Sequence, residues 1–279
     1  MKTSILIANM VLVACMSGCG GSGGSSTPTV AVIPTVDSIT ADKAMYSQLS
    51  TITVAGSNLE QGVSAAATGA CSSLTELNGG TAAKRMYSCT PATVGSINVT
   101  VSSASQAVLK TAAIQVPNPQ VTMVTTKGTI VVELNPSKAP ISVNNFLVYA
   151  HEGFYSSTLF HRVVPGFVVQ GGNISAIDGK PKATHNPIVL EPPSVTGLTN
   201  AVGTIAMART KDLNTATSQF FFNTVDNGNK LDAPAGGGYA VFGVVTTGMD
   251  IVKLIEATPI SDLTPLSSYV AVTSMVQNK

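Results

Sequence analysis

Apolar and polar residues alternate along short stretches that recur through most of the chain from about residue 36. Residues 97–101 (Ile-Asn-Val-Thr-Val) are a clear example. Because successive side chains of a strand point to opposite faces of a sheet, this alternation predicts strands with one buried face. Apolar residues at helical spacing follow Pro140 and recur near residues 250–256. The pattern therefore predicts a mainly β protein with few helices.

The strand-like stretches form two groups on either side of Pro117-Asn118-Pro119, which we interpret as a short stiff joint. In the first group, Gly, Asn and Ser separate the stretches at a spacing typical of a small β-sandwich. We predict an Ig-like β-sandwich domain over residues 35–117. It shows no catalytic constellation, and we interpret it as a spacer or adhesion module.

The second group covers residues 118–279. It begins with a hairpin at 121–134, and Pro140 then stands where the first turn of a helix accepts proline. Further strands follow, with a second helix near 250–256 and a last strand at 269–276. About eight strands and two helices are typical of an antiparallel barrel with helices over its open ends. We therefore predict an eight-stranded antiparallel β-barrel capped by two helices.

Composition excludes some classes of partner. Charged residues make up 10% of the 279 residues and the formal net charge is +1. A nucleic-acid-binding face needs clustered Lys and Arg, so we expect no nucleic-acid partner. After the first twenty residues, no apolar run approaches the roughly 18 residues that span a bilayer.

The N-terminal residues resemble a bacterial lipoprotein signal. Lys2 precedes an apolar run at 5–14 that has the length of a signal peptide. Cys15 and Cys19 each follow small residues, as in a lipobox, whose cysteine is acylated. We prefer Cys19, because a Gly/Ser-rich stretch suited to a flexible tether follows it directly. Cys15 is the alternative, and an ordinary secretory signal is the competing interpretation.

This interpretation makes residues 1–18 a lipoprotein signal peptide and residues 19–34 a tether. Several acyl chains give a stable anchor where a single chain does not. Gly20 follows Cys19 where an Asp would oppose sorting to the outer membrane. We expect a lipid-anchored protein of the bacterial cell envelope, on the periplasmic face of the outer membrane.

The remaining cysteines, Cys71 and Cys89, lie in the predicted sandwich. In an exported protein, a pair of cysteines in one small domain favours a disulfide. A metal site is the competing interpretation, but no His lies near them in the sequence. We predict a disulfide and no metal.

The segment 160–172 carries the chemistry that matters most. It predicts a strand, a turn at Pro165-Gly166 and a second strand. Val168 and Gln170 share a face of the second strand, and Arg162 on the facing strand can reach them. An Arg and a Gln beside an apolar floor, without a nucleophile or an obvious general base, suit chemistry made of binding, desolvation and hydrogen bonding.

Three segments closely resemble the cyclophilin family of peptidyl-prolyl cis-trans isomerases, in particular its bacterial periplasmic type: Phe160–Gly172, Gly203–Arg209 and Ala216–Phe221. The resemblance extends from about Val121 to the end of the chain. It implies a cyclophilin barrel, isomerase activity (EC 5.2.1.8 class) on X-Pro bonds, and proline-containing polypeptides as substrates. It implies no metal, nucleotide or other cofactor.

The resemblance also implies roles for single residues. Arg162 looks like the catalytic arginine, and Gln170 looks like the polar group that acts with it. The implied substrate-binding residues are Phe167, Val168, Met207, Ala208, Arg209, Gln219, Phe221, Leu231 and Tyr239. Phe220 and Phe222, which flank Phe221 on the other face of their strand, are expected in the core.

Three positions depart from the best-known members of the family. Val168 stands where Met is common, and Lys230 where many members have Trp or another aromatic residue. Tyr239 stands where many eukaryotic members have His, and the periplasmic type is similar to this chain in carrying Tyr there. The loss of the aromatic residue at Lys230 predicts weak sensitivity to cyclosporin.

The leading hypothesis is an anchored, monomeric prolyl isomerase that assists the folding of exported proteins. The alternative is a peptide-binding chaperone or interaction module with weak turnover, which the same groove would serve. The variant Arg162→Ala separates the two hypotheses, because only an enzyme has isomerase activity to lose.

Overall fold

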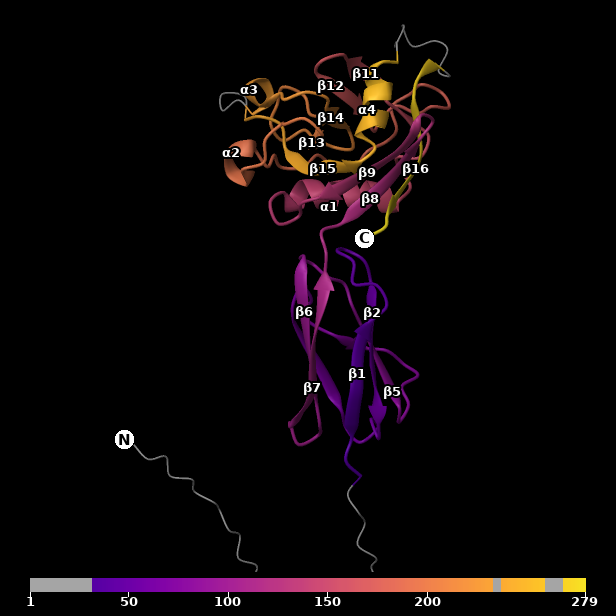
Figure 1. Cartoon of the computed structure of the whole chain (residues 1–279), viewed down its shortest axis with the longest axis vertical. Coiled ribbons are helices and arrows are strands. Elements are labelled where there is room, and N and C mark those ends of the chain that lie inside the picture. The colour runs from indigo at the N-terminus through magenta and orange to yellow at the C-terminus, as the bar shows by residue number, and fades with distance from the viewer. Residues whose placement is uncertain (1–31, 233–236, 259–267) are drawn as a thin grey trace, which may run out of the picture. The chain divides into compact units, whose positions relative to one another are not determined.

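The computed structural model describes residues 32–232, 237–258 and 268–279. The predicted signal peptide, Cys15, Cys19 and most of the tether lie outside the described residues. The fold is mainly β, as the alternating pattern predicted, and the described strands pair antiparallel in three sheets (Figure 1). No helix in these ranges is both long enough and apolar enough to cross a membrane.

Two of the sheets lie within the predicted sandwich range. Their strand orders are β1-β2-β5-β4 and β3-β6-β7. The bounds are β1 (Thr35–Ala41), β2 (Ser50–Ser57), β3 (Ser64–Gly69), β4 (Thr75–Glu76), β5 (Lys84–Cys89), β6 (Gly95–Ser102) and β7 (Val108–Val116). Ile97, Val99 and Val101 of β6 are fully buried, whereas Asn98 between them is exposed. The alternation in the sequence therefore marks the buried face correctly.

Cys71 and Cys89 form a disulfide, as expected, with their Cα atoms 6.3 Å apart. Both cysteines are buried and belong to the hydrophobic core. The bridge closes a sequence separation of 18 residues, and a loop of this length stabilises a fold by about 3 kcal/mol in the chain-entropy model.

The third sheet has nine strands, in the order β10-β16-β8-β9-β15-β13-β14-β12-β11. The bounds are β8 (Gln120–Thr125), β9 (Gly128–Leu134), β10 (Thr158–Leu159), β11 (Arg162–Val164), β12 (Val168–Gly171), β13 (Thr204–Met207), β14 (Phe220–Asn223), β15 (Val241–Thr247) and β16 (Ala271–Gln277). Only Phe160 and His161 separate the two edge strands along the chain, so the sheet must curl back on itself. The prediction of eight strands was one too few, because a strand of two residues such as β10 shows no alternation.

Two helices of the barrel occur where the sequence predicted them, α1 (Pro140–His151) and α4 (Met249–Glu256). Two further helices, α2 (Pro193–Thr196) and α3 (Gly228–Leu231), were not predicted, because a single turn is too short to show helical spacing. The first turn of α1 is capped by a residue that lies far away in the sequence. The Glu191 carboxylate accepts hydrogen bonds from the backbone N–H groups of Ile141 and Ser142, at 2.9 and 2.8 Å.

Aromatic side chains fill the barrel. Phe160, Phe220 and Phe222 are at most 1% exposed and pack edge-to-face or tilted against one another. Phe146 of α1 packs on Phe220 with ring centroids 5.6 Å apart. The predicted core positions of Phe220 and Phe222 are confirmed, and they leave Phe221 on the opposite face of β14.

Candidate active site

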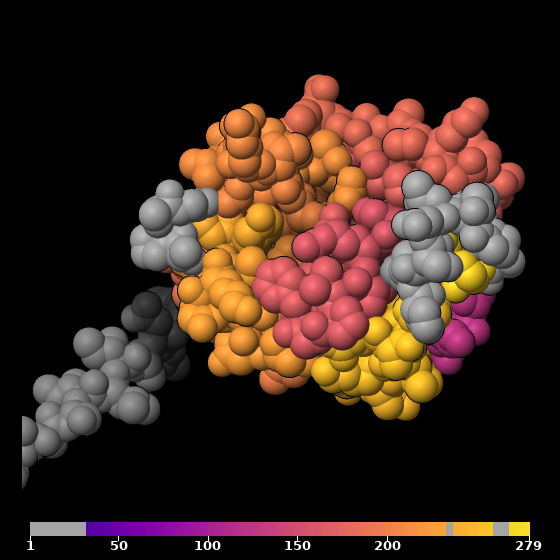
Figure 2. All heavy atoms as spheres, turned by 90° about the horizontal axis from the view of Figure 1, so that it is seen from above, coloured from indigo at the N-terminus to yellow at the C-terminus, as the bar shows by residue number. Residues whose placement is uncertain are grey.

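The hairpin β11–β12 sets the position of Arg162. The register pairs Arg162 with Gln170 and Val164 with Val168. Gly166 has a φ of 69°, a left-handed conformation that glycine adopts without strain, and it turns the chain between the two strands. Figure 2 looks onto the face of the barrel where this segment, in rose, lies beside the orange and yellow segments that follow residue 200.

A chain of side-chain amides orients the guanidinium. Arg162 Nη1 donates to Gln170 Oε1 at 3.2 Å, and Gln170 Nε2 donates to Gln219 Oε1 at 2.9 Å. Since the Gln170 amide then has its oxygen toward Arg162 and its nitrogen toward Gln219, it holds the arginine by one N–H. The remaining N–H groups of Arg162 stay available for another acceptor.

Arg162 lies at a pocket of about 240 Å³. The pocket is lined by Arg162, Phe167, Val168, Gln170, Ala208, Arg209, Phe221, Leu231 and Tyr239. All nine are among the eleven residues that the resemblance pointed to. The structure therefore brings together side chains from segments more than seventy residues apart in the sequence.

Two of the eleven residues do not line this pocket. Gln219 reaches it only through its hydrogen bond to Gln170. The side chain of Met207 is 1% exposed and belongs to the main core. Its neighbours Ala206 and Ala208 pack on the pocket side of β13, since alternate residues of a strand face opposite ways. The side chain of Met207 therefore faces away from the pocket, and the substrate-binding role that the resemblance implies for it would have to use its backbone, on the strand edge that pairs with the residues before proline.

The floor of the pocket is apolar and buried. Val168, Ala206, Phe221, Leu231 and Val241 form a small cluster of their own, each at most 9% exposed. Tyr239 packs edge-on against Phe221, with ring centroids 5.6 Å apart. A compact apolar group that enters the pocket loses its contact with water on these walls.

The charged groups around this floor are cationic. Arg209 donates to the Gly238 carbonyl from Nε at 3.1 Å and from Nη2 at 2.7 Å, and its guanidinium lies 4.6 Å from the centroid of the Tyr239 ring. The lining residues include no carboxylate. Among the described residues, none of the three ion pairs involves Arg162.

His161 precedes the arginine and adds no charge near neutral pH. Burial lowers the pKa of His161 below its ordinary value, and the positive charge of Arg162 lowers the pKa further. The neutral imidazole therefore leaves Arg162 as the cation of this strand.

Three buried asparagines behind the pocket were missed by the sequence analysis. Asn227 Nδ2 donates to the Phe167 carbonyl at 2.8 Å and to Asn223 Oδ1 at 2.9 Å. Asn223 Nδ2 donates to Asn200 Oδ1 at 3.1 Å. Asn200 Nδ2 in turn donates to the Tyr239 carbonyl at 3.2 Å. The amide chain thus ties the backbones of two pocket walls, Phe167 and Tyr239, to each other.

Each of these asparagines is at most 1% exposed. The only sequence signal was Asn223 itself, a polar residue at the end of the apolar run 220–222. A buried amide needs partners, so such a residue indicates a hydrogen-bond network behind it.

The turn that carries Phe167 is also held by α4, which the sequence analysis did not foresee. Glu256 Oε1 accepts from the Gly166 N–H at 2.8 Å and from the Thr224 hydroxyl at 2.6 Å, and Lys253 Nζ donates to Glu256 Oε2 at 2.8 Å. Partial burial raises the pKa of Glu256, but these hydrogen bonds outweigh it and keep the pKa below its ordinary value.

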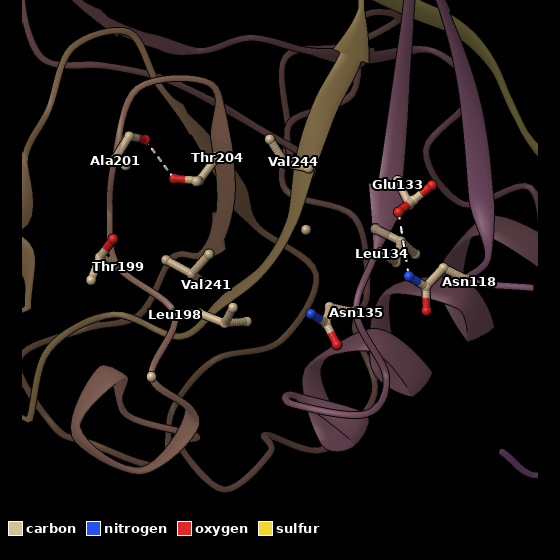
Figure 3. Close-up of a pocket in the computed structure, with 12 residues that line it drawn as sticks. Asn118, Glu133, Leu134, Asn135, Leu198, Thr199, Ala201, Thr204, Val241 and Val244 are labelled. Atoms are coloured by element: carbon tan, nitrogen blue, oxygen red, sulfur yellow. Dashed lines mark hydrogen bonds between the residues drawn. The ribbon is translucent and has the colours of Figure 1, made fainter. Parts of the chain in front are cut away.

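A second hollow of about 260 Å³ opens elsewhere on the barrel, between β9, β15 and the segment 197–201 (Figure 3). Its polar groups partly satisfy one another: Asn118 donates to Glu133 at 3.3 Å, and the Thr204 hydroxyl donates to the Ala201 carbonyl at 2.7 Å. None of its lining residues is Arg, Lys or His. This second hollow therefore offers no cationic hydrogen-bond donor. The Arg162 pocket, although slightly smaller, is the better candidate active site.

Comparisons with known proteins show which proteins this chain is similar to. The family model described as cyclophilin type peptidyl-prolyl cis-trans isomerase/CLD matches residues 120–277. Peptidyl-prolyl cis-trans isomerase A of Dickeya dadantii is 42% identical over 158 residues, which cover 57% of this chain and 82% of the relative. Peptidyl-prolyl cis-trans isomerase B of Escherichia coli is 47% identical over 142 residues, which cover 49% of this chain and 83% of the relative. A solved cyclophilin-type isomerase of Cryptosporidium parvum has 25% identity and a TM-score of 0.48, covering 58% of this chain and 99% of that one.

Proposed function

The chain belongs to the cyclophilin-type peptidyl-prolyl cis-trans isomerases and is an enzyme of that activity, and we propose that it catalyses rotation about X-Pro bonds of exported proteins in the Arg162 pocket. The observation that carries the proposal is the guanidinium of Arg162, held by Gln170 at a pocket that has an apolar floor and no carboxylate among its lining residues.

The chemistry needs no nucleophile. Rotation of an amide is slow because nitrogen lone-pair donation gives the C–N bond partial double-bond character, with a barrier of ~18–20 kcal/mol. Before proline the two isomers are close in energy, yet exchange takes tens to hundreds of seconds. In the twisted transition state the nitrogen lone pair is localised, so the prolyl nitrogen becomes a hydrogen-bond acceptor that the planar ground state lacks.

Arg162 supplies a donor for that nitrogen. An N–H of Arg162 that bonds to the pyramidal nitrogen stabilises the twisted state and does little for the planar one, which is what lowers a barrier. Gln170, already bonded to Gln219, prevents the arginine from swinging away. Lowering the barrier by about 5–7 kcal/mol accelerates exchange by roughly 10⁴–10⁵.

The apolar floor supplies the second part of the mechanism. Phe167, Val168, Phe221 and Leu231 hold the pyrrolidine ring while the acyl part of the bond turns. The burial of Val168, Phe221 and Leu231 keeps water off these walls, where it would otherwise compete for the guanidinium. No proton is transferred and no covalent bond forms in this scheme.

The assay of choice measures exchange on a short alanyl-prolyl peptide by NMR exchange spectroscopy, with the full chain at increasing concentration. We expect an exchange rate that rises linearly with enzyme concentration. If the peptide binds without any acceleration, the isomerase proposal fails, and the alternative of a peptide-holding chaperone replaces it.

We also propose that the protein is anchored to the envelope by acylation of Cys19, and the support is the lipobox-like sequence followed by a Gly/Ser tether. Mass spectrometry of the N-terminal peptide from a bacterial host tests the proposal. We expect diacylglycerol on Cys19, loss of the modification in Cys19→Ala, and its retention in Cys15→Ala. Modification at Cys15 in the unaltered chain would overturn the choice of cysteine.

A further inference from the structure

We propose that this pocket selects proline peptides that carry an acidic side chain beside the proline, and that Lys230 is the residue that determines this preference. The inference rests on the proposed function and narrows it to a class of substrate. It follows from where Lys230 lies, what holds it there, and which charges surround it.

Lys230 lies at the rim of the pocket. Its Nζ is 5.5 Å from the centroid of the Phe167 ring, and the next residue, Leu231, lines the pocket with 9% of its surface exposed. The aliphatic stem of a lysine can cover an apolar ring while its ammonium group stays in water. A cation is therefore presented at the edge of the wall that contacts the proline ring.

The backbone of Lys230 is fixed relative to that wall. The backbone N–H groups of Lys230 and Leu231 both donate to the Asn227 carbonyl at 2.9 Å. The side chain of the same Asn227 donates to the Phe167 carbonyl at 2.8 Å. One buried residue thus connects the short helix α3 to the wall, and only the lysine side chain itself is free to follow a substrate.

The charge of Lys230 is not neutralised within the described part of the chain, where no ion pair includes it. The carboxylates next to it in the sequence have other partners. Asp226 Oδ1 accepts from the Gly228 N–H at 3.0 Å, and Asp232 Oδ1 accepts from Asn200 Nδ2 at 2.6 Å. The charged residues that line the pocket itself are Arg162 and Arg209, and no carboxylate is among its lining residues.

A substrate presents the residues that flank its proline to these cationic side chains. An acidic side chain there gains an ion pair with a cation that has none, whereas a basic side chain is repelled. Exposed ion pairs change an equilibrium constant by at most about fivefold. We therefore expect a preference of about three- to fivefold in kcat/KM at low ionic strength, decreasing with salt as the charges are screened.

The test uses blocked peptides in which Glu, Gln or Lys stands directly before the proline, and a second series in which the same residues stand directly after it. NMR exchange spectroscopy gives kcat/KM for the full chain on each peptide. For the unaltered protein we expect Glu to be the best substrate and Lys the poorest in at least one series. In Lys230→Gln the ratio of Glu to Lys peptide should fall toward one, and in Lys230→Glu it should invert. The matched control is Lys127→Gln, an exposed lysine at the tip of the β8–β9 hairpin, which should keep the original ratio.

The outcomes separate the two levels of the proposal. Equal rates for all peptides in both series, or an unchanged preference in Lys230→Gln, overturn the role of Lys230 and leave the isomerase intact. No acceleration of any peptide overturns the proposed function, and the inference with it.

Discussion

Replacing Arg162 by alanine is expected to lower kcat/KM for an alanyl-prolyl peptide about 10²- to 10³-fold, the loss that follows removal of one donor aimed at a transition-state charge. Arg162 is exposed, and the side chain to which it donates a hydrogen bond is that of Gln170. Its removal therefore leaves no buried group without a partner. We expect the free energy of unfolding to change by less than about 1 kcal/mol, as for other surface substitutions.

The variant Arg162→Lys separates the effect of the positive charge from that of the hydrogen-bond geometry. Lysine keeps the charge but lacks the planar fork that donates to Gln170 and to a second acceptor at the same time. If catalysis depends on the hydrogen bond to the prolyl nitrogen and not on the positive charge alone, the kcat/KM of Arg162→Lys should be close to that of Arg162→Ala. Lys127→Ala serves as the control, because it removes a cation outside the pocket. Activity retained in Arg162→Ala within about threefold would show that the apolar pocket acts without the arginine.

The second large effect is expected on stability, from Asn223→Ala. Its side chain is fully buried, donates to Asn200 and to the Thr204 hydroxyl, and accepts from Asn227. Truncation of Asn223 leaves a buried polar group of Asn200 and one of Asn227 without a hydrogen-bond partner, and each such group costs about 1–3 kcal/mol of stability. We expect the free energy of unfolding of the barrel to fall by about 3 kcal/mol, and Tm by roughly 6–12 °C in calorimetry.

Asn229→Ala is the matched control for this variant. Asn229 is an exposed asparagine six residues further along the chain, in α3. Its truncation should leave Tm within about 2 °C, since surface substitutions away from special features change little. Equal Tm values for the Asn223 and Asn229 variants would mean that the buried amides do not hold the pocket walls together.

Local pattern predicted the elements that carry the site. The dipeptide Pro165-Gly166 and the alternation around it predicted the β11–β12 hairpin, and the observed pairing of Arg162 with Gln170 follows from that turn. The alternation in β14 likewise separated Phe221 from Phe220 and Phe222. The same rule explains why the side chain of Met207, which lies between Ala206 and Ala208, faces the core.

Hydrogen bonds between residues far apart in the sequence could not be predicted from the local pattern of apolar and polar residues. Glu191 caps a helix that begins about fifty residues before it, and Glu256 holds a turn ninety residues away. Both appear in the sequence as ordinary surface carboxylates. Nothing in their neighbours predicts the backbone N–H groups that they bind.

The sequence by itself determined the strands, the hairpin with its Arg and Gln on one face, the disulfide and the family of the barrel, because these depend on spacing within a few residues or on motifs of fixed order. Only the tertiary structure decided which side chains close the pocket and what holds its walls. Residues 162, 209, 230 and 239 meet only after the sheet curls, and the buried amides find their acceptors on backbones that the sheet brings within reach. The closing of the pocket depends on hydrogen bonds and packing between distant segments, which no local pattern of apolar and polar residues records.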